Sequence, residues 1–214
     1  MSETPSSGTG TTEETTEETT PEEVYSTIGL RDIVVAKLLT DVAGSAPTYD
    51  TVQSLVGAID LDISDNSGDP DAQYYDDHEA DVIIPDPELK GTVELADLPP
   101  DKVAMLLGYS IDNNGVTIHN AEDKPPYFAW GFKSRKSNGK DRYVWYYKGR
   151  CTLPQDKHTT RQKQVSRQTT KMQVTFIKLT SNGNARAFVD EDTEDFASAK
   201  ATFFSAPYTP DFST

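Results

Sequence analysis

The stretch from Leu89 to Gly108 has the clearest alternation of hydrophobic and polar positions in the chain. At residues 89–95 the pattern has a period of two, which predicts a strand with one buried face. Two prolines then suit the first turn of a helix, and apolar side chains recur three and four positions apart. Gly108 suits the left-handed position after a helix. The sequence therefore predicts a strand and a short helix at about 99–107 that covers one open end of a sheet. The helix residues expected to face inward are Val103, Leu106 and Leu107.

Two earlier segments predict further strands. Residues 28–39 form an apolar, β-branched run that is typical of a buried strand. In the segment 59–64 apolar residues alternate with polar ones, so Asp60 and Asp62 lie on the face opposite the apolar side chains. This strand is expected to have an apolar inner face and an acidic outer face. The residues expected on its inner face are Ile59, Leu61 and Ile63.

Residues 127–153 predict a long aromatic hairpin whose loop lies at 136–140. Thirteen of the twenty Lys and Arg residues fall between Lys133 and Lys178, so basic charge is interleaved with aromatic residues. That combination occurs on nucleic-acid platforms, but the regular alternation favours a structural core. On the return strand we expect one common face for Tyr143, Trp145, Tyr147, Cys151 and Leu153.

The acidic segment 65–81 is too long and polar for an ordinary hairpin turn, and long loops are usually functional or disordered. Its spacing does not match an EF-hand, because Gly68 at the glycine position would put Ile63 at the first ligand position. An adventitious calcium site at 65–81 stays open as an alternative. Tyr74 and Tyr75 are better interpreted as anchors for a partner surface, since aromatic residues on a polar segment are common at interfaces.

Length and charge narrow the class of protein. The chain has 214 residues, which suits one domain with extensions, and a formal net charge of −15, which disfavours free binding to nucleic acid or anionic membrane. A single cysteine excludes an intramolecular disulfide, and no apolar run approaches a membrane span or a signal segment. We expect a disordered Thr/Glu-rich arm at 1–23, a β domain at 24–195 and an irregular C-terminal extension at 196–214. The aromatic rings of that extension are expected to pack on a neighbouring molecule.

Known catalytic patterns are missing from the sequence. The three histidines are isolated, no Gly-rich phosphate loop precedes a helix, and neither a nucleophile elbow nor a metal-ligand pair on a helix occurs. The sequence thus predicts a protein that is not an enzyme, with no catalytic, cofactor-binding or metal-binding residues.

Four stretches in order resemble the major tail protein family of long-tailed, non-contractile bacteriophages, in the branch typical of Gram-positive hosts. They are IGLRDIVVAKLL, AQYYDDHEADV, LKGTVELADLPPDKVAMLLGYSIDNNGV and KPPYFAWGFKSRKSNGKDRYVWYYKGRCTLP, and they cover roughly residues 24–195. The resemblance implies a mainly β tail-tube fold, a sandwich or barrel with one flanking helix and long loop or hairpin extensions. Six copies would form a ring, and rings would stack into the tube through which DNA passes. The Thr/Glu-rich arm departs from the family pattern.

Charge agrees with such an assembly. Thirteen acidic residues and one basic residue lie between Asp60 and Asp97, whereas the aromatic hairpin is basic, so copies can attract one another head to tail. We expect Asp60 and Asp62 on the inner wall of the tube; the alternative is that they face the solvent outside it. The expected contacts between subunits are Tyr74, Tyr75, Asp76, Asp77 and Glu79 on one copy with Arg135, Lys136 and Arg142 on the next.

The resemblance also implies partners and a place in the cell. These are the tape measure and tail terminator proteins, assembly in the host cytoplasm and a final location in the virion, with DNA passing through without specific binding and no membrane anchor. The alternative is a monomeric OB-like module that binds single-stranded nucleic acid through the basic aromatic hairpin.

Overall fold

The computed structural model describes residues 25–65, 71–75, 78–83, 88–152, 169–197 and 199–210. For residues 65, 71–75 and 78–83 it describes the backbone alone. The first strands are β1 (Thr27–Thr40), β2 (Thr48–Tyr49), β3 (Gln53–Ser54), β4 (Ala58–Asp65), β5 (Asp71–Tyr75), β6 (His78–Ile83) and β7 (Leu89–Leu95). Helix α1 (Pro100–Leu107) precedes β8 (Ser110–Ile111), β9 (Thr117–Ile118), β10 (Tyr127–Lys136), β11 (Asp141–Cys151), β12 (Thr170–Phe176), β13 (Arg186–Asp190) and the 3-10 helix η1 (Glu194–Ala197).

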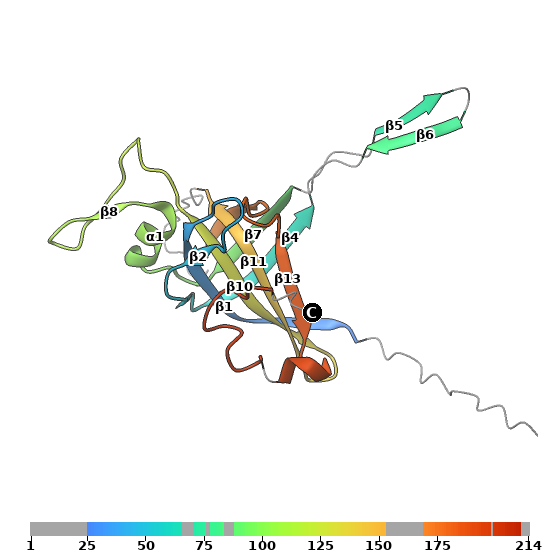
Figure 1. Cartoon of the computed structure of the whole chain (residues 1–214). Coiled ribbons are helices and arrows are strands. Elements are labelled where there is room, and N and C mark those ends of the chain that lie inside the picture. The colour runs from blue at the N-terminus through green and yellow to red at the C-terminus, as the bar shows by residue number, and fades with distance from the viewer. Residues whose placement is uncertain are drawn as a thin grey trace, which may run out of the picture.

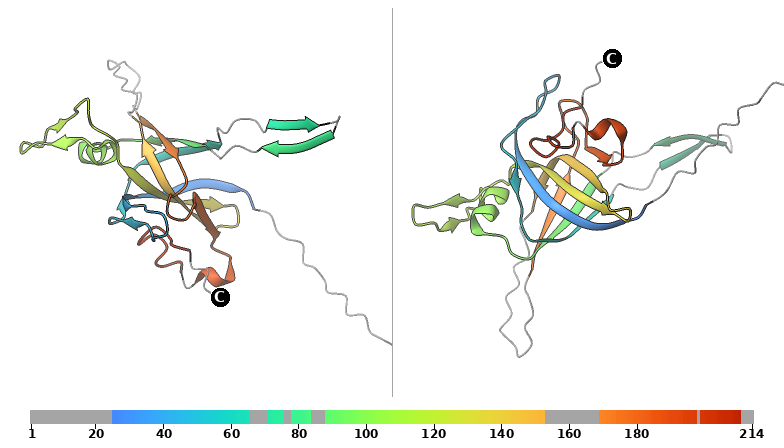
Figure 2. Two further views of the ribbon diagram at one scale, coloured as in Figure 1. Left: turned by 45° about the horizontal axis from the view of Figure 1, so that its top comes forward. Right: turned by 90° about the horizontal axis from the view of Figure 1, so that it is seen from below.

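The main sheet is antiparallel and curls into a barrel (Figures 1 and 2). Its order is β2-β1-β10-β11-β12-β7-β4, and β3 pairs with the same edge of β1 as β2 does. Since β3 leads within a few residues into β4, and β4 also contacts β1, the two ends of the sheet meet. The protein is therefore mainly β with one short helix, as the sequence predicts.

Helix α1 has the predicted position and orientation. Leu106 and Leu107 are fully buried in the barrel core, Val103 packs against the same core, and Gly108 ends the helix with a φ of 75°. A side chain at Gly108 would also meet the backbone carbonyl oxygen of Lys124 at 2.8 Å. The strand before it, β7, alternates as predicted, with Gly91, Val93 and Leu95 buried.

β11 pairs with three strands and contains a bulge. It pairs with β10 along one edge, while β13 and β12 follow one another along the other edge. Phe128 pairs with Gly149 but Trp130 pairs with Tyr146, so two residues of β11, Tyr147 and Lys148, lie opposite one residue of β10. Such an extra residue exchanges the faces of all side chains beyond it.

This bulge makes one sequence interpretation wrong. Tyr143 and Trp145 face outward into a second cluster, whereas Cys151 lies in the barrel core, so these residues do not share a face. Leu153 lies outside the described residues. In β4 a register shift next to Asp60 likewise leaves Ile59 53% exposed, while Leu61 and Ile63 pack inward as expected. Both ends of β1 are also exposed, at Ile28 and Leu39.

The C-terminal clasp, residues 194–197 and 199–210, covers the outer face of the β10–β11 hairpin. Phe196, Phe203 and Phe204 pack around Tyr143 and Trp145, and Trp145 Nε1 donates a hydrogen bond of 2.8 Å to the Phe203 carbonyl oxygen. The described rings of the extension, which the sequence analysis assigned to a neighbour, thus pack on their own subunit, and Phe212 lies outside the described residues. This hairpin is accordingly buried on both faces.

A nine-residue excursion, 177–185, separates β12 from β13 and is anchored by Asp41. The Asp41 carboxylate accepts hydrogen bonds from the backbone N–H groups of Thr180 and Ser181, at 2.9 and 2.8 Å, and pairs with Lys148 Nζ at 2.5 Å. Desolvation raises the pKa of Asp41, but the hydrogen bonds from Lys148 and the two amides outweigh it and hold that pKa well below 3.8. The carboxylate therefore stays ionised and fixes the excursion to the end of β1.

Candidate functional site

The outward side chains of β4, β7 and β12 form a continuous polar face, here called the polar wall. Register aligns them in three rows across the strands, because each residue of β7 pairs with one residue on either side. The inward side chains of the same strands fill the barrel core. The polar wall consists of Asp60, Asp62 and Ser64 on β4, Lys90, Thr92 and Glu94 on β7, and Lys171, Gln173 and Thr175 on β12.

The polar wall carries uncompensated negative charge. Glu94 pairs with Lys171 at 3.0 Å and Lys90 with Glu88 at 3.2 Å, so these charges are balanced locally. A hydrogen bond from Thr169, followed by that from Lys171, lowers the pKa of Glu94. Asp60 and Asp62 are exposed, and neither forms an ion pair with any residue that the structure describes. The two residues predicted to line a lumen are thus the excess charge of the wall.

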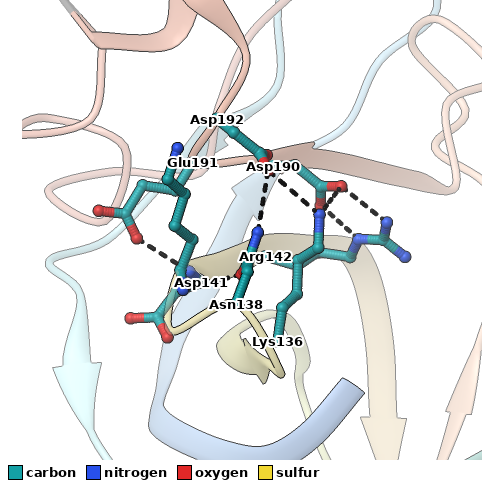
Figure 3. A network of polar contacts seen from close by, with 8 residues as sticks. Lys136, Asn138, Asp141, Arg142, Asp190, Glu191 and Asp192 are labelled. Carbon is teal, nitrogen blue, oxygen red and sulfur yellow. Dashed lines mark hydrogen bonds and ion pairs between the residues drawn. The ribbon is translucent and has the colours of Figure 1, made fainter. Parts of the chain in front are cut away.

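The three cations predicted to bind a neighbour lie at the turn end of the β10–β11 hairpin and are paired within the subunit. Figure 3 shows two of them, Lys136 and Arg142. Arg142 forms a two-pronged contact with Asp190, Nε–Oδ1 2.5 Å and Nη2–Oδ2 2.8 Å, and Lys136 Nζ lies 2.9 Å from the same carboxylate. Arg135 pairs with Asp141 at 3.0 Å. We call this cluster the hairpin ion network. Its further members are Asn138, Glu191, Asp192 and Lys200.

The hairpin ion network is a structural element of the subunit. Hydrogen bonds from Arg142 and then Lys136 lower the pKa of Asp190 to about 2, and the hydrogen bond that Lys136 donates to Asp190 raises the pKa of Lys136. The sequence analysis assigned no role to the acidic cluster at 190–195. Charge is the signal that could have indicated this contact, because the basic residues of the hairpin need carboxylate partners and the cluster at 190–195 supplies them.

Pairing also reaches the rest of the basic hairpin. Lys133 pairs with Asp32 at 2.7 Å, across a bulge where Asp32 has a φ of 49°, and Lys148 pairs with Asp41. The aromatic side chains between them lie in the barrel core or under the clasp. A single-stranded nucleic-acid platform needs exposed rings and free cations. The described hairpin offers neither along most of its length, so the geometry does not favour the nucleic-acid alternative.

The acidic segment forms a hairpin of its own. Strands β5 and β6 pair only with each other, and Figures 1 and 2 show them standing away from the barrel. Tyr74, Tyr75 and Glu79 belong to these strands, while Asp76 and Asp77 lie outside the described residues. The contact of this hairpin with a second copy stays a prediction. The calcium alternative for 65–81 depends on side chains outside the described set.

Other comparisons give no further assignment. Neither the models of known protein families nor the curated proteins contain a match to this chain. Within the described ranges no group of three His, Cys, Asp or Glu side chains is placed to hold a metal ion. No helix in the same ranges is both long and apolar enough to cross a membrane.

Proposed function

We propose that this protein is a structural subunit that forms six-membered rings, and that the rings stack into the tail tube of a long-tailed, non-contractile bacteriophage. The observation that carries the proposal is the β5–β6 hairpin, which projects from a barrel that is otherwise complete (Figure 1). Such an extension is expected of a subunit that reaches a neighbour, and the resemblance of the sequence to major tail proteins supports a tail tube as the assembly.

An isolated two-stranded hairpin is marginally stable in water. Ordering the backbone of its 5-residue and 6-residue strands costs roughly 11 to 22 kcal/mol, at about 1–2 kcal/mol per residue. Pairing between β5 and β6 offsets part of this cost, and burial against another surface can offset the rest. A neighbouring copy supplies that surface in a stacked assembly, because head-to-tail contacts between identical subunits repeat without limit.

The polar wall supports the assignment of a lumen. It is polar across three strands and carries Asp60 and Asp62 as excess negative charge. Negative charge on the inside of a tube repels the phosphate backbone, so DNA slides past without binding. In this proposal the wall faces the channel, and the protein acts in the virion as a conduit for DNA ejection after assembly in the host cytoplasm. Tape measure and tail terminator proteins are the proposed partners.

The hairpin provides the decisive experiment. Deleting residues 66–79 removes most of the β5–β6 hairpin but leaves the barrel strands intact. We expect a folded subunit, by circular dichroism and thermal unfolding, that no longer forms tubes in negative-stain images or rings and polymers in size-exclusion chromatography.

A matched control shortens a different projection. Removing residues 112–116 truncates the β8–β9 hairpin, which extends from the helix end of the barrel (Figure 1), and is expected to leave tubes intact. Tubes of normal length from the variant that lacks 66–79 would contradict the proposal. So would a wild-type protein that stays monomeric at every concentration.

A further inference from the structure

We infer that the groove at the open end of the barrel binds an acidic peptide, and that its occupant is the Glu-rich arm of the same subunit, residues 1–24. The inference does not depend on the proposed tube, because it concerns a contact within one chain. Three independent observations carry it: an uncompensated arginine, an exposed ring beside it, and the point at which the arm joins the barrel.

The groove lies at the end of the barrel opposite α1, between β1, β10, β11 and β13, and has a volume of about 230 Å³. Its floor includes Tyr146, which is nearly fully buried, and its rim includes Phe188, which is 56% exposed. Thr27 and Ser134 line the side nearest the first described residues of the chain. An apolar floor with a polar rim is a suitable surface for a short peptide.

Two arginines of the groove lie over the Phe188 ring, but only one of them has a carboxylate partner. Arg142 Cζ is 5.7 Å from the ring centroid and is held by Asp190. Arg186 Cζ is 4.9 Å from the same ring, and Arg186 Nη1 donates a hydrogen bond of 3.4 Å to Tyr146 Oη. No ion pair engages Arg186 among the described residues. Its guanidinium is thus exposed, oriented and free to bind a carboxylate with two parallel hydrogen bonds.

The arm has the complementary charge. Residues 1–24 contain seven Glu and no Lys or Arg. Two other cations of this end, Lys136 and Arg142, are paired with Asp190, and Lys136 also with Asp192, so Arg186 is the groove cation without an ion pair among the described residues. Acidic segments bind such clusters through their carboxylates, with the aromatic ring contributing apolar contact to the peptide backbone and Thr methyl groups.

The arm also joins the barrel at the rim of the groove. The Ser26 carbonyl oxygen accepts a hydrogen bond of 2.8 Å from the Ser137 N–H, and Lys136 Nζ lies 5.7 Å from the Tyr25 ring centroid. Thr27 is itself part of the lining. Glu22 and Glu23 are five and four residues before Thr27, so they reach points up to about 18 Å away. Tethering at this distance gives an effective concentration on the order of mM, so a weak contact is enough.

Disulfide trapping in the full-length chain tests the contact. Thr19→Cys places a thiol in the arm without removing a carboxylate, and Ser134→Cys places one in the groove. The native Cys151 does not compete, because it is 1% exposed and burial raises its pKa to about 12. Under mild oxidation we expect an intramolecular disulfide, detected by mass spectrometry and by faster migration without reductant.

Matched variants separate binding from random collision. The control pair combines Thr19→Cys with Ser110→Cys, because Ser110 is an exposed serine at the helix end of the barrel. Its cross-linking yield is expected to be at least about fivefold lower than that of the Ser134 pair. Arg186→Glu is expected to lower the Ser134 yield to this background. Arg150→Glu is expected to leave the yield unchanged, although Arg150 also stacks on a ring, Tyr127 at 4.0 Å. Salt at 1 M, where the screening length is about 3 Å, is also expected to lower the yield.

Each outcome supports or overturns the inference. Equal yields at Ser134 and Ser110, or a yield that Arg186→Glu does not change, would overturn it. Mixing the Thr19→Cys protein with the Ser134→Cys protein tests which copy supplies the arm. Covalent dimers from this mixture, with no intramolecular disulfide in the double variant, would assign the groove to the arm of a second copy. If Ser134→Cys lowers folding, Thr27→Cys on the same lining replaces it.

Discussion

The two walls of the barrel differ in how their outer faces are covered. The β4–β7–β12 wall has an apolar inner face and the polar wall outside, so burial alternates along β7. The β10–β11 wall is covered inside by the barrel core and outside by the clasp, so every residue of β11 from Tyr143 to Gly149 is buried. A strand that is covered on both sides needs apolar or paired side chains at every position.

The difference assigns separate tasks to the walls. The doubly covered wall holds much of the packing, and most of its charged groups are paired, either in the hairpin ion network or with Asp32 and Asp41. The polar wall contributes to stability through its inner face alone, so its outer side chains are free to serve a surface property such as charge. Substitutions on the two outer faces should therefore have very different effects on the free energy of unfolding.

Trp145→Ala is expected to have the largest effect. Trp145 is fully buried, contacts Phe204 at a centroid distance of 5.4 Å and donates a hydrogen bond to Phe203. Its loss leaves a large cavity under the clasp and should lower the free energy of unfolding by about 3–5 kcal/mol. Urea unfolding measures this, and limited proteolysis should show earlier release of the clasp. Gln173→Ala on the polar wall is the control, with a change within about 0.5 kcal/mol; similar values for the two variants would refute the comparison.

Asp190→Asn should have an intermediate effect that depends on pH. Arg142 and Lys136 lower the pKa of Asp190 to about 2 from its ordinary value of 3.8. A pKa that is lower in the folded state contributes stability that is present above pH 4 and is lost as pH falls from about 4 to 2. We expect Asp190→Asn to cost about 1.5–3 kcal/mol at pH 7, the range for hydrogen bonds to charged groups.

Unfolding free energies measured at several pH values check this prediction. The wild-type protein should lose stability between pH 4 and pH 2, and Asp190→Asn should lose less over that interval. Asp60→Asn is the matched control at pH 7, because Asp60 is exposed and without a described ion pair, and should change stability by less than about 0.5 kcal/mol. An unchanged acid profile in Asp190→Asn would contradict the assigned role.

The local sequence pattern was enough to predict the central strand of the β4–β7–β12 wall and the helix that follows it. The strand at 89–95, the helix after it and Gly108 in the left-handed conformation all follow from the period of the apolar positions and from proline and glycine chemistry. The hairpin at 127–151 was predicted as well. In β7 and α1 each residue keeps the face that its spacing predicts, whereas in the hairpin the bulge changes the faces within β11.

The errors arise where a long-range contact decides the outcome. The bulge at Tyr147 and Lys148 depends on pairing with Ala129, and nothing in the sequence of β11 marks it. Likewise, the clasp and the hairpin ion network join residues about 50 positions apart, such as Arg142 with Asp190. Charge counting identified the basic hairpin, but topology decides which carboxylate pairs with which cation.

The smallest effect on stability, with the largest on function, is expected for Asp60→Lys combined with Asp62→Lys. Both side chains are exposed on the polar wall and their strand keeps its inner contacts through Leu61 and Ile63. The unfolding free energy should change by less than about 0.5 kcal/mol per site, and tubes should still form. If the wall faces the channel, six copies would turn a repulsive lining into an attractive one for phosphate, and DNA ejection from reconstituted particles should slow.

Asp97→Lys with Glu122→Lys makes the same change in net charge at exposed positions off the polar wall, and should leave ejection at the wild-type rate. Ejection that is equally fast in both double variants would place Asp60 and Asp62 away from the DNA path, whereas loss of tubes in the first variant alone would place them at a contact between subunits.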